Sequence, residues 1–583
     1  MNKFLQDLTT LIKTAFLNAG FDEEVVVSDC AIAELGDFQC QTALALAKKY
    51  RMSPLMIAQK VVENFTENKL IKSISAVNPG YINFFVTDEA LSQEFKAELE
   101  NLDKPLGVDN RITVVDYGGA NVAKPLHVGH LRSANIGESI KRICTYAGNK
   151  TIGDVHLGDW GLQMGMIIAQ LQAQHPDWIY FDENFTGEYP QESPITVKDL
   201  ETLYPQASQK AKADEEFKKK AQDAMVELQN GRRGYYALWK HFLEVSKKDL
   251  KTHYDALNVN FELWLGESDS VKYYPALIEE IIAKGYAKES QGATIVEVEE
   301  EADVNPVPPF MLKKSDGGVT YATTDLATIV QRDKELGAER MVYVVDKRQD
   351  LHFKQVFRCT KKTGVTSKDI QLDFAGFGTM NGKDGKPYKT RDGGVMQLGV
   401  LIADVIKKAE EKVEEAKGQN ADYSLEEKKE ISTAVAISAL KFADLSIFRM
   451  KDYIFDPDKF CSFEGKTGPY LLYTITRAKS ILKKSGQNSF ENFEISHMPR
   501  QLVLTLLAFK SEAEKAYQEL APSVLCDYVY KLANLFNTFY NSCNIISEED
   551  QAKKSSWLYL TNAVVKFMEK VLDLLAIKTL EKM

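Results

Sequence analysis

Two histidines, His127 and His130, stand where their side chains could bind a phosphate chain. An apolar run, residues 112–115, precedes them and predicts a strand. A helical pattern follows and ends at Gly148, and its apolar face carries Ile136, Ile140, Ile143, Cys144 and Ala147. At the start of such a helix, free N–H groups and the helix dipole favour an anion. Gly129 leaves the backbone open to an adenine or a ribose, so the segment predicts a nucleotide site.

The elements that must position these histidines form a central α/β region. Strand and helix patterns alternate from Arg111 to about residue 392, which predicts a Rossmann-type, doubly wound parallel sheet. The candidate core strands are residues 112–115, 341–345 and 374–377. Ligands of such sheets gather at the carboxyl ends of the strands.

The patterns on either side of this region differ from it and predict three domains. The predicted ranges are 1–108 for a small N-terminal α/β domain, 109–395 for the Rossmann-type domain and 396–583 for a C-terminal all-α bundle. A largely helical insertion is expected at about residues 163–274. Ser424 and Glu427 form a capping-box pattern that predicts the start of a bundle helix.

The composition is that of an ordinary globular protein. The chain has 583 residues, 44% of them hydrophobic and 27% charged, which suggests roughly three or four domains. A net charge of −11 argues mildly against a nonspecific polyanion binder, since such proteins are usually basic. A local basic face can still bind RNA on an acidic protein.

The cysteines and the apolar stretches indicate the cellular compartment of the protein. Seven cysteines, at positions 30, 40, 144, 359, 461, 526 and 543, form no C-x-x-C pair, so we expect reduced thiols and no structural zinc. The first residues lack the apolar stretch of a signal peptide. The longest apolar stretch, near residues 502–509, falls far short of the ~20 residues that a membrane span needs. We therefore expect a cytoplasmic protein without a membrane anchor.

The strand–turn–helix segment resembles the nucleotide-binding signature of class I aminoacyl-tRNA synthetases. Residues 120–133, Ala-Asn-Val-Ala-Lys-Pro-Leu-His-Val-Gly-His-Leu-Arg-Ser, resemble the version found in arginyl-tRNA synthetases. The resemblance continues in the family's order through residues 156–161 (HLGDWG), 321–327 (YATTDLA), 349–353 (QDLHF), 385–391 (GKPYKTR) and 462–470 (SFEGKTGPY). Such ordered agreement over most of the chain is more specific than any single block.

The resemblance implies an arginine–tRNA ligase. The carboxylate of L-arginine would attack the α-phosphate of ATP and expel pyrophosphate, and the arginyl group would then pass to the 3′ end of tRNA(Arg) with release of AMP. ATP would be a substrate accompanied by Mg²⁺, and no metal ligands are expected. In-line attack needs positioning and N–H or cationic groups more than a covalent nucleophile. Members of this family are mostly monomers and assemble the active site only with tRNA bound.

The resemblance also implies roles at the nucleotide. Many class I synthetases carry a Lys-Met-Ser-Lys-Ser loop, which this chain lacks, and residues 382–391 stand in its place. In arginyl enzymes a lysine just before the histidine motif supplies the missing charge, and Lys124 occupies that position. The predicted catalytic residues are His127, His130, Lys124 and Lys389. The predicted ATP contacts are His127, Gly129, His130, Lys389 and Arg391. The order of importance among Lys124, Lys389 and Arg391 stays open, and the alternative role for each histidine is a helix cap.

A second set of residues would bind the amino acid. A guanidinium, with its planar fork of donors, requires carboxylates and carbonyl-type acceptors. Tyr321 and Asp325 are four apart at the start of a helical pattern, so both can face one cavity. By resemblance they would hold the guanidinium, Asn121 and Gln349 would hold the α-amino and carboxylate end, and Asp116 would pair with the substrate's positive charge. Taken singly, each aspartate is as well explained as a helix cap or a salt-bridge partner.

The flanking domains would contact the tRNA by the same resemblance. Residues 36–40, before a helical pattern at 43–49, look like part of the family's N-terminal tRNA-contacting domain. Without the rest of the chain, a loop and a surface helix would be the preferred explanation. The C-terminal bundle would read the anticodon stem.

Two alternatives remain open on the sequence. One is another class I synthetase or nucleotidyltransferase, although the cysteines lack zinc-ligand spacing and no large editing insertion is evident. The other is a synthetase-like RNA-binding protein without catalysis, against which His127, His130, Tyr321 and Asp325 argue.

Overall fold

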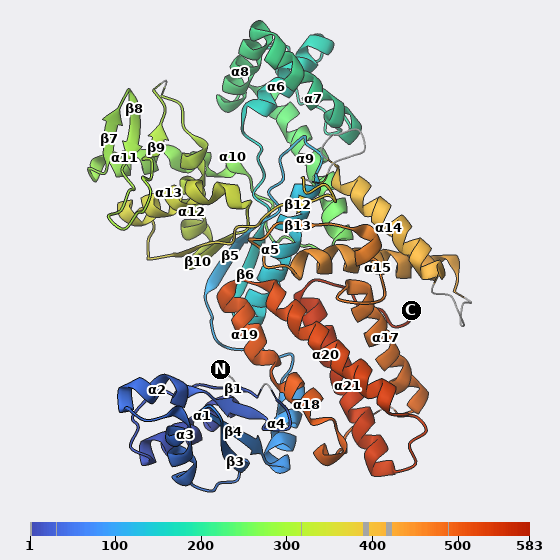
Figure 1. Ribbon diagram of the computed structural model, residues 1–583. Coiled ribbons are helices and arrows are strands. Elements are labelled where there is room, and N and C mark those ends of the chain that lie inside the picture. Colours follow the sequence, from blue (N-terminus) through green and yellow to red (C-terminus); the bar gives the residue numbers. More distant parts are fainter. Residues whose placement is uncertain are drawn as a thin grey trace.

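The computed structural model describes residues 3–30, 32–315, 317–386, 388, 396–415, 423–487 and 489–583. In Figure 1 a central parallel sheet separates a helical insertion at one end from two regions at the other, the N-terminal sheet region and the C-terminal helices, which lie side by side. Among the described residues, no helix is long and apolar enough to cross a membrane.

The N-terminal region is a four-stranded antiparallel sheet with the strand order β1-β2-β4-β3, covered by helices. Its strands are β1 (Val27–Asp29), β2 (Phe38–Cys40), β3 (Ile71–Val77) and β4 (Tyr81–Val86). Its helices are α1 (Lys3–Asn18), α2 (Thr42–Tyr50), α3 (Pro54–Glu63) and α4 (Asp88–Glu100). Arg500 of the C-terminal region binds Asp37 at 2.6 Å and so fixes this sheet to the helices beside it.

The central sheet has four parallel strands in the order β11-β10-β5-β6, which confirms the predicted fold class. The strands are β5 (Ile112–Asp116), β6 (Lys150–Asp154), β10 (Arg340–Tyr343) and β11 (Gln371–Phe374). From β5 the chain passes through α5 (Val128–Ala147) to β6 on one side, and later to β10 on the other. The strand order therefore reverses between β5 and β10, and the carboxyl ends of these two strands mark the place where such folds bind ligands.

One predicted strand is shifted. The sequence predicts a strand at residues 374–377, whereas β11 covers Gln371–Phe374. β11 pairs only with β10 and forms the edge of the sheet, so polar Gln371 and Asp373 are tolerated there. A search for apolar runs misses such a strand and selects the buried Ala375 and Phe377 that follow it.

The chain between β6 and β10 adds two further groups of elements. The first is helical and consists of α6 (Leu162–Gln174), α7 (Val197–Ala213), α8 (Glu215–Gln229) and α9 (Arg233–Ala256). The second contains α10 (Glu267–Ser270), η1 (Val271–Tyr273), α11 (Tyr274–Ala283), β7 (Ala287–Ser290), β8 (Ala293–Val296), β9 (Phe310–Lys313) and α12 (Tyr321–Leu336). β7, β8 and β9 form an antiparallel sheet that the sequence analysis did not anticipate.

The rest of the chain is mostly helical. After β10 come η2 (Lys347–Gln349), α13 (Asp350–Thr363), β11 and β12 (Met380–Asn381). The C-terminal elements are α14 (Leu398–Glu415), α15 (Leu425–Leu445), β13 (Tyr453–Ile454), α16 (Pro457–Phe460), α17 (Gly468–Ser485), η3 (Ile495–His497), α18 (Arg500–Leu507), α19 (Phe509–Glu519), α20 (Pro522–Ser542) and α21 (Gln551–Leu574). The predicted capping box opens α15, where Ser424 and Glu427 satisfy each other's backbone N–H groups.

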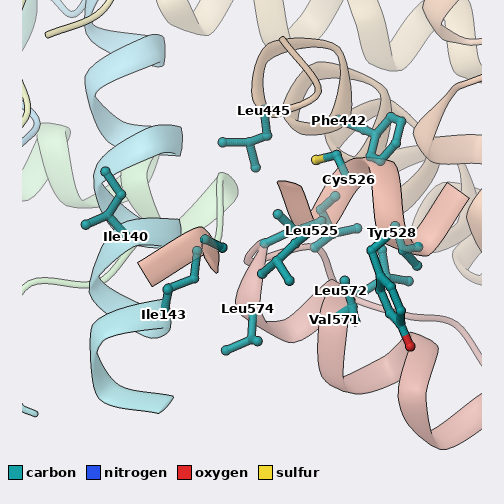
Figure 2. Close-up of a cluster of buried hydrophobic side chains, with 14 of the residues drawn as sticks. Ile140, Ile143, Phe442, Leu445, Leu525, Cys526, Tyr528, Val571, Leu572 and Leu574 are labelled. Atoms are coloured by element: carbon teal, nitrogen blue, oxygen red, sulfur yellow. The ribbon is translucent and has the colours of Figure 1, made fainter. Parts of the chain in front are cut away.

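Helix α5 is held between the central sheet and the C-terminal helices. Most of its residues are buried, and Figure 2 shows Ile140 and Ile143 facing the apolar cluster formed by α15, α20 and α21. Near its first turn, Arg132 binds Asp444 of α15 at 2.7 Å, and both side chains are almost fully buried. Because α5 is fixed along its whole length, the residues at its N-terminus have a rigid support.

Candidate active site

The two histidines of the motif cap the N-terminus of α5. His127 is the N-cap residue, and its Nδ1 accepts the Gly129 N–H at 3.0 Å. The Nδ1 of His130 accepts the N–H of His127 at 3.0 Å. The two rings lie side by side, with centroids 3.9 Å apart. The capping role is observed, and it is compatible with the predicted phosphate role because each cap occupies only Nδ1.

Burial and the neighbouring charge of Lys124 disfavour the protonated form of both rings. Burial lowers the pKa of His130 to about 3, and the pKa of His127 is lowered by partial burial and by the charge of Lys124. Both rings are therefore neutral near pH 7. A neutral imidazole that accepts a hydrogen bond at Nδ1 carries its proton on Nε2. Within the described part of the chain, each histidine thus keeps one N–H free for an incoming oxygen.

Gly129 allows this arrangement. A Cβ at position 129 would lie 2.8 Å from Cε1 and 2.9 Å from Nδ1 of the His127 ring. Any side chain there would push the ring off its hydrogen bond. The glycine is therefore needed for the histidine geometry as well as for backbone access.

Met396, which follows the segment that contains Lys389 and Arg391, lies beside the histidines. The carbonyl of Met396 accepts the N–H of Val128, in the first turn of α5, at 3.1 Å. Tyr388 is the last described residue before Met396. Lys389 and Arg391 lie outside the described residues, so their roles stay predictions.

Asn121 belongs to a loop that is joined to the loop after β6. Gly158 donates its N–H to Ala120 and accepts the N–H of Val122, both at 3.0 Å. A Cβ at position 158 would overlap the Oδ1 of Asn121. The HLGDWG block thus positions Asn121 and explains why a glycine stands at 158.

The side chains of Asp325 and Tyr321 face the same histidine. Both residues lie in the first turns of α12, which begins at Tyr321 as its pattern predicts. Asp325 Oδ2 lies 2.6 Å from Nε2 of His352 on α13, and the Tyr321 ring stacks on the His352 ring with centroids 4.3 Å apart. Tyr321 is 60% exposed, which leaves its outer face open to a ligand.

Asp116 has an internal partner. Arg332 of α12 is fully buried and binds both Asp116 and Asp154, each at 2.7 Å, at the carboxyl ends of β5 and β6. Burial raises the pKa of Asp116, and Arg332 opposes that change. Two carboxylates around one guanidinium leave the group negative when both are ionised. The structural alternative, a salt bridge, is therefore realised for Asp116, and its contact with substrate stays a prediction.

Gln349 follows β10 on the side of the sheet where the strands have their carboxyl ends, and it directly precedes α13. It is exposed, and its side chain makes no hydrogen bond within the described part of the chain. His352 follows it one helical turn later.

The sequence analysis gave no role to four residues near the carboxyl ends of these strands, although two of them lie in the quoted blocks: His156, Glu267, Arg332 and His352. A charged residue inside an apolar helical pattern is the signal that would have found Arg332. His156 has a positive φ of 42°, and both of its ring nitrogens are buried with no hydrogen-bond partner among the described residues. Burial raises the pKa of Glu267, which lies close enough to Asp325 for their charges to interact.

The described residues contain no group of three or more His, Cys, Asp or Glu side chains that could hold a metal ion. All seven cysteines are free thiols, and six of them are buried.

Three family models match the chain. They are the class I (R) tRNA synthetase catalytic domain over residues 94–457, the DALR anticodon binding domain over residues 471–583, and the arginyl tRNA synthetase N-terminal domain over residues 5–86. Curated relatives named arginine–tRNA ligase include those of Agathobacter rectalis, 46% identical over 604 residues, and Alkaliphilus oremlandii, 46% identical over 595 residues. Both alignments cover 100% of this chain and of the relative.

Two solved structures match over the full length of both chains. The arginyl-tRNA synthetase of Plasmodium falciparum has a TM-score of 0.80 at 25% identity. That of Thermus thermophilus has a TM-score of 0.81 at 23% identity and supports the fold alone. With full-length relatives at 46% identity and a matching catalytic-domain model, the chain belongs to the arginyl-tRNA synthetases, class I enzymes that ligate arginine to tRNA.

Proposed function

We propose that this enzyme forms arginyl-adenylate at the carboxyl edge of the central sheet, between the N-terminus of α5 and the first turns of α12 and α13. The arginyl group then passes to the 3′ end of tRNA(Arg). The observation that carries this assignment is the pair of neutral histidines at α5, because their free Nε2–H groups are donors for phosphate oxygens beside a helix N-terminus. The carboxylate of Asp325 lies at the same edge, where a cationic side chain would enter.

The phosphate end requires charge as well as hydrogen bonds. Neutral histidines donate without a full positive charge, so we propose that the Lys124 ammonium supplies one as negative charge develops during in-line attack. Lys389 and Arg391 are proposed as further ATP contacts. Mg²⁺ is proposed to enter with ATP, bound mainly by the phosphates.

The residues proposed for the amino-acid end of the site suit a cationic side chain. We propose that Asp325 binds the guanidinium while Tyr321 lies against its plane, an arrangement that suits the flat donor fork of arginine. Asn121 and Gln349 are proposed to hold the α-amino and carboxylate groups. Asp116 is proposed to add negative charge near the substrate, although Arg332 already holds its Oδ2.

The flanking regions are proposed to hold the tRNA. The N-terminal domain, proposed as residues 1–108, would contact the body of the tRNA, and the helical domain, residues 396–583, would read the anticodon stem. Residues 109–395 would then form the catalytic domain, with the insertion at about 163–274. We also propose that the enzyme works as a monomer in the cytoplasm.

Arginine activation is expected to depend on tRNA. Pyrophosphate exchange should require L-arginine among the amino acids and should be fast only when tRNA(Arg) is added, because arginyl enzymes complete their active site with tRNA bound. The measurement is the ATP–pyrophosphate exchange rate with and without tRNA(Arg), with lysine and citrulline as amino-acid controls. Equal rates with and without tRNA would show that this enzyme departs from its family, and exchange with another amino acid would contradict the proposed substrate.

A further inference from the structure

The side chain of Lys124 contacts the helical insertion. Its ammonium Nζ lies 4.5 Å from the centroid of the Tyr204 ring, in the first half of α7. Both side chains are half-buried. Among the described residues, no carboxylate forms an ion pair with Lys124. The contact that holds the ammonium in this part of the chain is therefore the Tyr204 ring, while Glu201 and Asp249 line a small cavity together with Lys124 without forming an ion pair with it.

The backbone of the same turn is also held by the insertion. Ala123 has a positive φ of 61°, a conformation that a residue with a side chain rarely adopts. Its N–H donates to the Oγ of Ser246, on α9, at 3.0 Å. Leu200 of α7 and Leu250 of α9 line a very small cavity against this turn. The two insertion helices therefore fix both the backbone before Lys124 and the end of its side chain.

An aromatic ring can orient a lysine without neutralising its charge. The negative face of the ring attracts the ammonium and limits the rotamers of its flexible four-carbon stem. A carboxylate would do the same but would cancel most of the charge that a phosphate needs. The charge of Lys124 also lowers the pKa of both His127 and His130, so the ammonium lies on the side of the histidines.

We propose that Tyr204 is a positioning residue that holds the Lys124 ammonium, without a carboxylate ion pair, at the phosphate end of the site. The helical insertion thereby takes part in adenylate formation through a single aromatic ring. The inference rests on the proposed role of Lys124, and its test separates the two.

The test compares Tyr204→Leu in two backgrounds, the natural enzyme and Lys124→Met. Arginine-dependent pyrophosphate exchange is measured on the full chain with tRNA(Arg). In the natural background, Tyr204→Leu should lower kcat roughly two- to thirty-fold, the range of a cation–ring contact, and leave the arginine KM nearly unchanged. In the Lys124→Met background the same change should have almost no effect.

Two further variants control for side effects. Tyr204→Phe keeps the ring and should lose much less activity than Tyr204→Leu. Lys210→Met removes a similar contact on the same helix, where the Lys210 ammonium lies 4.6 Å from the Phe217 ring, and should leave kcat unchanged.

The outcomes distinguish the two proposals. An equal loss from Tyr204→Leu in both backgrounds would overturn the positioning role, because the ring would then act independently of Lys124. A full rate in Tyr204→Leu combined with a strong loss in Lys124→Met would overturn it as well while supporting Lys124. A full rate in Lys124→Met would refute the role of Lys124 itself, and the inference with it.

Discussion

Replacing His130 with alanine is expected to lower kcat for arginyl-adenylate formation by about 100- to 1000-fold, the usual effect of losing one preorganised donor to a developing oxyanion. The Nε2–H of His130 has no partner among the described residues, and its ring is neutral because burial lowers its pKa to about 3. Since the donor acts on the transition state, the loss should be seen in kcat, with tRNA binding nearly unchanged. Single-turnover formation of the adenylate measures the effect.

His130→Asn separates chemistry from capping. The asparagine oxygen can accept the His127 N–H as Nδ1 does, but it has no group in the place of Nε2. This variant should melt close to the natural enzyme and be nearly as inactive as His130→Ala. If His130→Asn kept most of the natural rate, the histidine would be a helix cap only.

Replacing Asp325 with asparagine should raise the arginine KM strongly. The substitution keeps the shape but removes the charge that complements a permanent cation. Losing one partner of a desolvated charge pair costs ~2–5 kcal/mol, which corresponds to roughly one and a half to three decades or more in KM. The ATP KM should change little, and citrulline, the neutral isostere, should be discriminated against less than in the natural enzyme.

The Asp325→Asn variant needs a stability control. Asp325 also binds His352, so its loss affects the protein itself. If Asp325 served only α12 and His352, the melting temperature would fall and the arginine KM would stay the same. Measuring both KM values and the melting temperature on one preparation decides between these roles.

The sequence predicted best those features that depend on neighbouring residues. The strand, turn and helix around His127 follow from local apolar spacing and from a glycine at the end of α5, and the structure has them where the pattern places them. The start of α12 at Tyr321 is equally local. The edge strand β11 and the small sheet β7–β9 were shifted or missed, because their stability comes from partners distant in sequence or from hairpin pairing rather than from an apolar run.

The same difference between local features and features that depend on distant residues applies to the site. Gly129 and the two histidines lie within four consecutive positions, 127–130, and their mutual hydrogen bonds follow from helix capping. The buried pair of Asp116 and Arg332 joins positions 216 residues apart, and nothing in a single sequence connects them. The same holds for Lys124 and Tyr204, which only the folded insertion brings together.

The most direct test is the structure of this enzyme bound to tRNA(Arg) and a sulfamate analogue of arginyl-adenylate. The guanidinium should lie within hydrogen-bond distance of an Asp325 carboxylate oxygen. The sulfamate oxygens should lie within reach of the Nε2 atoms of His127 and His130 at the N-terminus of α5. A sulfamate bound away from that helix end, or a guanidinium facing residues other than Asp325, would contradict the assignment of the site.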